Sequence, residues 1–149
     1  MASDGKSIVN IWFDGQKYTK TNMDDCIENN NLPVFRRSKQ WLDSYFSGKN
    51  PKKDISICLD TTSFRKAVLE IVNKIPYGET RTYADIAKQL GQQMKDIKVS
   101  VRAVAGAIAH NPVLILIPCH RVIGANGKLT GYSAGLDRKK QLLEIEKQQ

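Results

Sequence analysis

The sequence predicts an α+β protein in which a short β-rich part precedes a longer helical part. Apolar and polar residues alternate over residues 7–19, which is the period of a strand with one buried face. From about residue 61 onward, the apolar residues recur at helical spacing instead. A polar segment at residues 48–53, which contains glycine and proline, separates the two patterns. We therefore divide the chain into residues 1–60 and residues 61–149.

The N-terminal part is expected to contain a hairpin and one helix. Asp14-Gly15 lies between the two short runs of residues 7–19, and this dipeptide is typical of a hairpin turn. Residues 35–46 then follow helical spacing, and Gly48 after them is a stop signal. The apolar residues at that spacing are Trp41, Leu42, Tyr45 and Phe46.

The C-terminal part is expected to be helical and to include a helix-turn-helix unit. Residues 63–74 form the first predicted helix. Thr82 is expected to cap a second helix that runs to Leu90 and is closed by Gly91. A third helix covers residues 99–110, and a basic helix follows near the C-terminus. Two short helices joined by a turn are typical of a helix-turn-helix.

The predicted helix at residues 99–110 has two contrasting faces. One face is expected to join the core and carries Val101, Val104, Ala105 and Ile108. The opposite face carries Arg102, Ala103, Gly106, Ala109 and His110. Glycine inside a helix costs about 1 kcal/mol relative to alanine, so Gly106 indicates a steric demand. Either another surface such as nucleic acid presses against this face, or another helix of the same chain does.

Charge indicates an anionic partner, and nucleic acid is the usual one. The 149 residues contain 23 Lys and Arg against 15 Asp and Glu, a net charge of +8. The excess is concentrated late in the chain, because residues 95–149 carry nine basic and four acidic side chains. A soluble basic surface without a partner is the alternative that charge alone leaves open.

Composition excludes several other classes of protein. Three cysteines, Cys26, Cys58 and Cys119, lack Cys-x-x-Cys spacing and indicate a reduced protein of the cytoplasm, or of the nucleus in a eukaryote. The two histidines form no cluster with metal-ligand spacing, so we expect no catalytic metal. No apolar run approaches the roughly 20 residues that span a membrane, so we expect no membrane partner.

The most informative motif is the run Ile117-Pro118-Cys119-His120-Arg121-Val122. It places a thiol and an imidazole side by side after an apolar segment that reads as a strand, which Pro118 breaks. A cysteine is nucleophilic only as the thiolate, and a nearby base makes that form accessible. The alternative is that Cys119 is a small buried apolar residue, the commonest environment of an unbridged cysteine.

Further motifs around this run make the chain resemble the O6-alkylguanine-DNA alkyltransferase family. The matching segments are Ile75-Pro76-Tyr77-Gly78-Glu79-Thr80, Thr82-Tyr83, Arg102-Ala103-Val104, Asn111-Pro112, Pro118-Cys119-His120-Arg121-Val122 and Gly131-Tyr132-Ser133. The resemblance implies an RNase H-like N-terminal domain, shortened here by about two strands, before the helical domain. It also implies direct-reversal DNA repair, in which an alkyl group moves irreversibly and once per molecule from guanine to a cysteine.

The resemblance assigns the reacting groups by position. Cys119 is the alkyl acceptor, and His120 takes its proton through a bridging water. Glu146 orients the imidazole, with Glu144 as a second candidate, and Asn111 braces the active-site turn. We expect no cofactor and no metal in this chemistry.

The resemblance also assigns the residues that meet DNA. Tyr83, Arg102, Tyr132 and Ser133 contact the substrate, and the serine amide donates to guanine O6. Thr82, Arg102, Ala103 and Gly106 lie on the DNA side, with the helix in the minor groove and Arg102 filling the gap left by the extruded base. The implied partner is duplex DNA that contains O6-alkylguanine, with O4-alkylthymine also tolerated, and the protein is expected to act as a monomer.

One departure and three alternatives remain. The connection at residues 92–98 is about five residues longer than in the better-known relatives, and Lys95 and Lys98 there either contact phosphates or are only solvated. A non-enzymatic alkyltransferase-like protein would usually have tryptophan in place of Cys119. A cysteine hydrolase would need an acyl-binding site, and a helix-turn-helix regulator would show longer polar side chains on its recognition helix.

Overall fold

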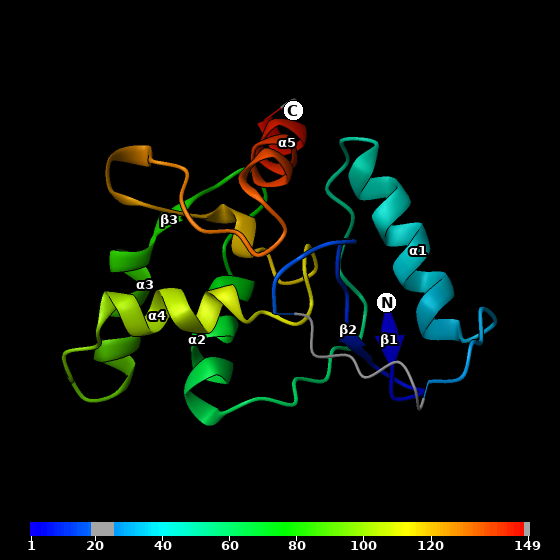
Figure 1. The fold of residues 1–149 in the computed structure, drawn as a ribbon, viewed down its shortest axis with the longest axis horizontal. Helices are drawn as coiled ribbons and strands as arrows, with labels where there is room; N and C mark the ends of the chain where they lie inside the picture. The colour runs from blue at the N-terminus through cyan, green and yellow to red at the C-terminus, as the bar shows by residue number, and fades with distance from the viewer. Residues whose placement is uncertain (19–25, 148–149) are drawn as a thin grey trace.

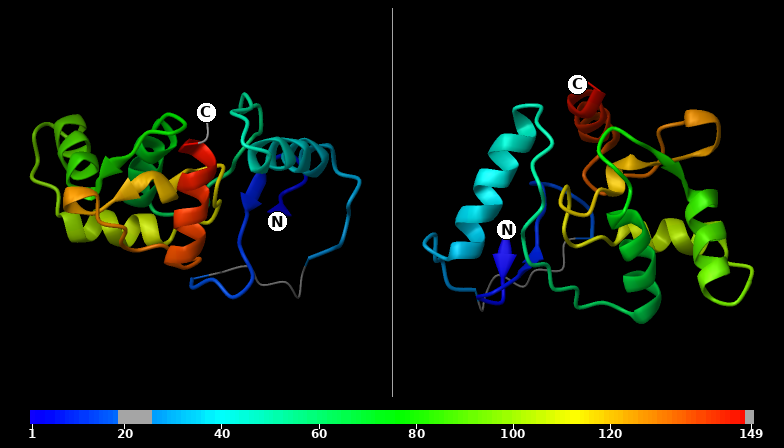
Figure 2. Two further views of the ribbon diagram at one scale, coloured as in Figure 1. Left: turned by 90° about the horizontal axis from the view of Figure 1, so that it is seen from above. Right: turned by 180° about the vertical axis from the view of Figure 1, so that it is seen from behind.

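The computed structural model describes residues 1–18 and 26–147, and it has the α+β architecture that the sequence predicts (Figure 1). Strands β1 and β2 and helix α1 lie on one side, helices α2 to α4 lie on the other, and α5 lies between them (Figure 2). The elements are β1 (Ala2–Ser3), β2 (Ile8–Asn10), α1 (Pro33–Phe46), α2 (Ser63–Asn73), β3 (Arg81–Thr82), α3 (Tyr83–Gln93), α4 (Val101–Ala109), η1 (Cys119–Arg121), β4 (Val122–Ile123), η2 (Ala125–Gly127) and α5 (Leu136–Lys147).

The hairpin predicted for residues 7–19 is wrong. The turn at Asp14-Gly15 exists, with Gln16 N donating to Phe13 O at 3.2 Å, but no strand pair flanks it among the residues that the structure describes. Instead β2 pairs antiparallel with β1. The second run finds its backbone partner elsewhere, because Lys17 N donates to Ser133 O at 2.9 Å. Residue 19, at the end of the predicted hairpin, lies outside the described residues.

Strand β2 joins the N-terminal part to the segment that leads to Cys119. On the side away from β1, Cys58 N donates to Ile8 O at 2.9 Å, so β2 has neighbours on both sides. Just beyond β2, Ile11 N donates to Pro112 O at 2.9 Å and Leu114 N donates to Ile11 O at 3.0 Å. The backbone of the N-terminal part therefore supports residues 112–114 directly.

Helices α1 and α3 confirm most of the sequence prediction. Helix α1 begins two residues before the predicted start, at Pro33, whose missing N–H is tolerated in a first turn. Thr82 caps α3 in a capping box, in which its hydroxyl accepts from Asp85 N and the Asp85 carboxylate accepts from Thr82 N.

The end predicted for α3 at Gly91 is wrong, because the helix continues to Gln93. Gly91 is inside the helix and buried, and a Cβ there would lie 2.4 Å from the backbone oxygen of Ile97. The glycine therefore allows the 92–98 connection to pack closely on α3, which explains its presence without a helix end.

Helix α4 is shorter than predicted, since Ser100 caps it and His110 follows its last turn. Val104 and Ile108 are buried as expected, but Val101 is 46% exposed, contrary to its predicted place in the core. Val99, which precedes the cap, packs against the core instead. The buried residues of α4 are Val104, Ala107 and Ile108, so the buried stripe is rotated toward Ala107 and Val101 lies at its edge.

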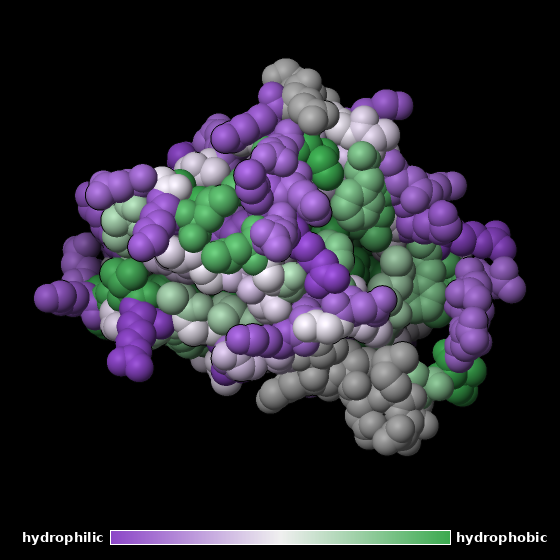
Figure 3. Space-filling model, turned by 45° about the horizontal axis from the view of Figure 1, so that its top comes forward, coloured by the Kyte–Doolittle hydropathy of each residue, from purple (hydrophilic) through white to green (hydrophobic). Residues whose placement is uncertain are grey.

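Hydrophilic residues dominate the face shown in Figure 3, and apolar residues occur on it in small separate groups. The core comes from all parts of the chain and includes Ile8, Tyr45, Leu69, Ile86 and Leu114. In the described part of the chain, no helix is long and apolar enough to cross a membrane.

Candidate active site

Cys119 lies at the start of η1, directly after a buried turn. The apolar segment before it was expected to be a strand, but residues 113–117 fold back on themselves, with Ile117 N donating to Val113 O at 3.0 Å. Ile115 adopts the left-handed conformation, with φ of 69°, which a strand does not contain. The turn leaves the Cys119 side chain only 2% exposed, against the wall of a small pocket.

Asn111 braces this turn, as predicted from its position. Its side-chain amide donates to Ile117 O at 3.0 Å and to the Cys119 sulfur at 3.1 Å. Its Oδ1 accepts from Val113 N at 3.0 Å. One buried side chain therefore fixes both ends of the turn and also presents a donor to the sulfur. A donor there stabilises the thiolate relative to the thiol.

His120 and Glu146 form the buried pair that was predicted. His120 Nε2 and Glu146 Oε1 are 2.7 Å apart, and both side chains are completely buried. The ionised carboxylate only accepts hydrogen bonds, so the His120 proton lies on Nε2 and the lone pair lies on Nδ1. Nδ1 is buried and has no partner among residues 1–18 and 26–147. Glu144, the second candidate, has a 55% exposed side chain that pairs with Lys140.

Arg121 balances the charge of Glu146, a role that the sequence did not reveal. Its guanidinium donates to both carboxylate oxygens, from Nε to Oε2 at 2.9 Å and from Nη2 to Oε1 at 2.9 Å. Gly78 N also donates to Oε2 at 3.0 Å. Burial by itself would raise the pKa of Glu146, but the hydrogen bonds from His120 and Arg121 lower this pKa to about 2.

This arrangement keeps the imidazole of His120 neutral. Burial is the main cause that lowers the pKa of His120, and Glu146 opposes the shift. Because the Arg121 cation already neutralises the carboxylate, Glu146 stabilises the protonated imidazole only weakly. A neutral imidazole with a lone pair on Nδ1 is the form that can accept a proton from a thiol.

The Cys119 thiol is protonated in the free protein and must lose its proton to a base before it can react. Burial raises the pKa of Cys119 to about 11, against the opposing effects of Asn111 and Lys139. The free thiol is therefore protonated near neutral pH, and it becomes a nucleophile only as its proton leaves. The site supplies both the base and a nearby cation for that step.

Lys139 is that cation, and the sequence prediction missed it. The side chain is completely buried, and its ammonium donates to Val122 O at 2.5 Å, to Thr130 O at 2.7 Å and to Gly131 O at 3.3 Å. Burial lowers the pKa of Lys139 to about 8, and Cys119 opposes the shift. The signal in the sequence is spacing, because Lys139 shares a helix face with Leu142, Leu143 and Glu146.

A pocket of about 260 Å³ opens beside the sulfur. Of the four predicted substrate residues, Tyr83, Tyr132 and Ser133 line this pocket and Arg102 does not. The N-terminal part contributes two further lining residues, Lys17 and Tyr18. The lining residues are Lys17, Tyr18, Tyr83, Ala105, Ile108, Ala109, Cys119, Gly131, Tyr132 and Ser133.

The loop at residues 130–133 forms one wall of this pocket. The Tyr83 hydroxyl donates to Thr130 O and Gly131 O, each at 3.2 Å. A Cβ at Gly131 would lie 3.1 Å from that hydroxyl, and its φ of 56° also favours glycine. Within the described ranges, the backbone N–H of Ser133 has no acceptor, and neither does the buried hydroxyl of Tyr132 have a partner.

The residues predicted to lie on the DNA side, Thr82, Arg102, Ala103 and Gly106, are outside the pocket. Arg102, Ala103 and Gly106 share an exposed face of α4, and no atom of the described residues lies within 4 Å of a Cβ built on Gly106. Packing against any of the helices that the structure describes therefore does not explain Gly106. Thr82 is already engaged in the cap of α3, so its contact with DNA stays a prediction.

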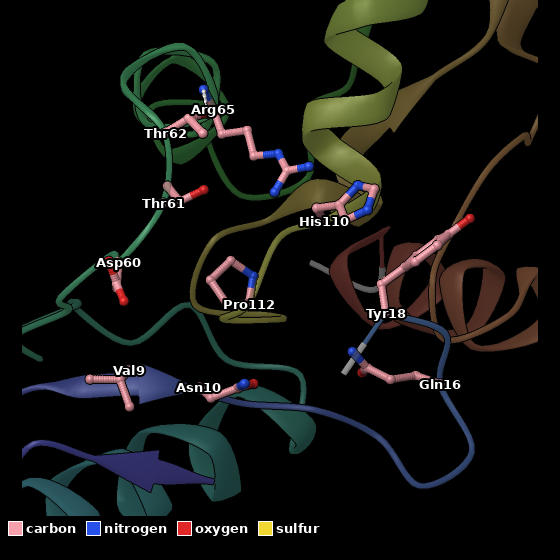
Figure 4. Close-up of a pocket in the computed structure, with 10 residues that line it drawn as sticks. All are labelled: Val9, Asn10, Gln16, Tyr18, Asp60, Thr61, Thr62, Arg65, His110 and Pro112. Carbon is pink, nitrogen blue, oxygen red and sulfur yellow. Dashed lines mark hydrogen bonds between the residues drawn. The ribbon is translucent and has the colours of Figure 1, made fainter. Parts of the chain in front are cut away.

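A second, larger cavity of about 580 Å³ lies between β2, the start of α2 and the end of α4. Figure 4 shows Arg65 reaching toward His110, with the ring of Tyr18 on the other side of this histidine. The Tyr18 and His110 ring centroids are 4.5 Å apart. This cavity does not contain Cys119, so it is separate from the candidate active site, although Tyr18 borders both.

The other two cysteines are poor candidates for the same chemistry. Cys26 and Cys58 are exposed, and neither lies in the pocket of Cys119. Over the residues that the structure describes, no group of three or more His, Cys, Asp or Glu side chains could hold a metal ion. The site is thus built on a single buried thiol and its hydrogen-bonded neighbours.

A pocket-lining cysteine beside a neutral imidazole that a carboxylate holds defines a protein with a thiol and its base, next to the helix pair α3 and α4. Comparisons give the family. The model described as 6-O-methylguanine DNA methyltransferase, DNA binding domain, matches residues 63–148, and the ribonuclease-like domain of the same family matches residues 1–61. The chain belongs to the 6-O-methylguanine DNA methyltransferase family.

Relatives and solved structures agree with this assignment. A methylated-DNA–protein-cysteine methyltransferase of Methanosarcina acetivorans is 47% identical over 83% of this chain and 74% of its own length. The Mycobacterium tuberculosis OGT, solved in complex with DNA, superposes with a TM-score of 0.81 at 37% identity, covering 98% of this chain and 84% of that chain. An O6-methylguanine DNA methyltransferase of Methanococcus jannaschii gives 0.63 at 35% identity, covering 100% and 87%.

Proposed function

We propose that this protein repairs DNA by direct reversal and transfers the alkyl group of O6-alkylguanine to its own Cys119. The observation that carries the proposal is the position of the Cys119 sulfur, at the wall of a pocket and 3.1 Å from the Asn111 amide. The buried His120 and Glu146 pair beside it, 2.7 Å apart, supports the same chemistry. Membership in the family supports the substrate class.

The reaction begins with loss of the thiol proton. His120 accepts it at Nδ1 through a water molecule, while Nε2 keeps its hydrogen bond to Glu146. Asn111 and the Lys139 ammonium stabilise the thiolate that forms. The sulfur attacks the alkyl carbon, so that an S–C bond forms as the C–O6 bond breaks. The electron pair of the broken bond stays on guanine, and the proton held by His120 passes to guanine, so that the products are neutral guanine and a thioether at Cys119.

The leaving group needs a donor near O6. The unpartnered N–H of Ser133, seen in the described residues, lies in a loop that lines the pocket and suits this task. One well-placed donor of this kind contributes about 3 kcal/mol to a transition state. Tyr83, whose hydroxyl bonds to the same loop, also lines the pocket and suits a hydrogen bond to an edge of the purine.

The DNA must present the base outside the duplex, because the thiol is buried. The exposed face of α4 enters the minor groove, where small side chains such as Ala103 and Gly106 allow a close approach. Arg102 fills the gap in the base stack, which offsets part of the few kcal/mol that extrusion costs. The protein acts as a monomer in this scheme.

The thioether product is stable, so each molecule reacts once. Mass spectrometry of the intact protein after incubation with an oligonucleotide that contains O6-methylguanine tests the proposal. We expect a mass gain of one CH₂ group, which peptide mapping assigns to Cys119. Tight binding to the lesion without any adduct would instead identify a non-enzymatic damage-recognition protein.

A further inference from the structure

We propose that Tyr45 of α1 is a positioning residue for the alkyl transfer, so that the N-terminal part of the chain takes a direct part in the chemistry. Its hydroxyl lies 2.7 Å from Glu146 Oε1 and 3.2 Å from His120 Nε2. The inference rests on the proposed function, because it concerns the same histidine and carboxylate. It goes further by assigning a reaction role to a residue of the N-terminal part.

The three groups form a closed triangle around one carboxylate oxygen. Glu146 Oε1 accepts from the Tyr45 hydroxyl and from His120 Nε2, each at 2.7 Å. The Tyr45 oxygen can also accept part of the Nε2–H bond, because it lies 3.2 Å from that nitrogen. Both interactions favour the tautomer with its proton on Nε2. This tautomer leaves Nδ1 as the acceptor for the thiol proton.

The ring of Tyr45 is held independently of its hydroxyl. The side chain is completely buried, and its ring stacks on Trp41 with centroids 5.4 Å apart. It also meets the rings of Tyr77 and His120 edge-on, at 6.0 Å and 6.4 Å. A Tyr45→Phe variant keeps these apolar contacts and still leaves Oε1 bonded to His120 and Arg121, so we expect it to fold.

The Tyr45 hydroxyl weakens the effect by which Glu146 raises the pKa of His120. The charged and titratable groups around His120 are Glu146 and Lys139 of α5, Arg121 and Cys119 of η1, and Tyr45 of α1. Without the Tyr45 donor, Glu146 Oε1 accepts one hydrogen bond fewer and therefore interacts more strongly with the proton on His120 Nε2. This stabilises the imidazolium, so the pKa of His120 rises. Below that pKa, His120 can no longer accept the proton of the thiol.

Two measurements on Tyr45→Phe test the inference. The first is the single-turnover transfer rate from a saturating duplex that contains O6-methylguanine, measured from about pH 5 to pH 9. We expect a rate about fivefold lower, since one buried hydrogen bond contributes about 1 kcal/mol. We also expect the acid limb of the profile to move up by about half a pH unit.

The second measurement is the NMR titration of the His120 ring in unreacted protein. The sequence has two histidines, so the His120 ring signals are readily assigned. We expect the pKa of His120 to be higher in Tyr45→Phe than in the wild type. Because this readout needs no alkyl transfer, it keeps the inference testable even if the proposed function fails.

The matched control is Tyr77→Phe. It removes a hydroxyl from the same aromatic cluster, but that hydroxyl contacts Ile145 O at 3.4 Å and does not bond Glu146 or His120. A wild-type profile and titration for Tyr45→Phe would overturn the inference. A slower rate with an unmoved acid limb and an unmoved His120 pKa would also overturn it, because Tyr45 would then serve only domain packing. Melting curves of both variants confirm that each is folded.

Discussion

The reaction centre and the proposed recognition face of α4 differ in nearly every physical respect, although we propose that both serve one reaction. Cys119, His120 and Glu146 are at most 3% exposed, and they are tied to one another and to their neighbours by hydrogen bonds. Arg102, Ala103 and Gly106 are exposed, and space is open around Gly106. Folding alone therefore assembles the reaction centre, whereas the exposed face of α4 gains its contacts only when a partner binds. Variants of the two regions should fail in different ways.

Cys119→Ser should have the largest effect. Serine is a far weaker nucleophile than the thiolate, so we expect transfer to fall by at least about a thousandfold. DNA affinity should change by less than about twofold, because the thiol is buried away from the face of α4. Adduct mass spectrometry and a gel-shift titration measure the two quantities. Retained transfer, with an adduct on Cys26 or Cys58, would contradict the assignment.

Glu146→Gln should come next. Loss of the carboxylate should slow transfer on the order of a hundredfold, because His120 loses its orienting partner. It also leaves Arg121 buried without its counter-ion, which should lower the free energy of unfolding by about 3–5 kcal/mol. Glu144→Gln is the matched control, since it removes a carboxylate from the exposed face of the same helix. Equal losses in the two variants would reject the role of Glu146.

The same carboxylate predicts how stability depends on pH. The pKa of Glu146 is about 2 in the folded protein and ordinarily 4.5, so the charged form stabilises the fold. That stabilisation is complete above about pH 4.5 and is lost as the pH falls toward 2. Melting temperatures measured across this range should fall more steeply for the wild type than for Glu146→Gln. Parallel curves would contradict the lowered pKa.

The pH profile of transfer should have an acid limb below the ordinary 6.5 of histidine, because burial lowers the pKa of His120. The imidazole then stays neutral to lower pH, and the rate should fall about tenfold per pH unit only below that limb. Single-turnover rates of the wild type across the acidic range check this. A limb at or above 6.5 would mean that Glu146 outweighs burial.

Gly106 should give the smallest effects, on the recognition face. Gly106→Ala should raise the free energy of unfolding by about 1 kcal/mol, because the helix gains propensity and no neighbour blocks a Cβ. Gly106→Leu should also fold but bind duplex DNA about tenfold more weakly, if a groove must fit against this face. Chemical denaturation and DNA titrations separate the two properties. Unchanged DNA affinity in the leucine variant would place the groove elsewhere.

Periodicity and local chemistry in the sequence were enough to predict the helices and the cap at Thr82. The sequence could not predict the close packing of the 92–98 connection at Gly91, or the turn at residues 113–117. Both depend on backbone that approaches from elsewhere in the chain. Apolar residues in the buried turn have the composition of a strand, and only their tertiary surroundings decide between the two.

The candidate site shows the same division. The resemblance placed Cys119, His120, Glu146 and Asn111, and the structure brings these four together. Arg121, Lys139 and Tyr45 were missed as site residues, because each acts through a partner that folding alone brings near. The feature of the sequence that could have identified two of them is a polar side chain on the buried face of a helix, as at Tyr45 and Lys139.

Arg102→Ala, assayed on two substrates, tests most directly whether recognition and chemistry are separate. The first substrate is duplex DNA that contains O6-methylguanine, and the second is free O6-benzylguanine, which needs no extrusion. Because Arg102 is exposed and lies outside the pocket, we expect repair of the duplex to slow by about tenfold or more and the reaction with the free base to stay unchanged. Equal losses on both substrates would contradict the separation and would tie Arg102 to the reaction centre.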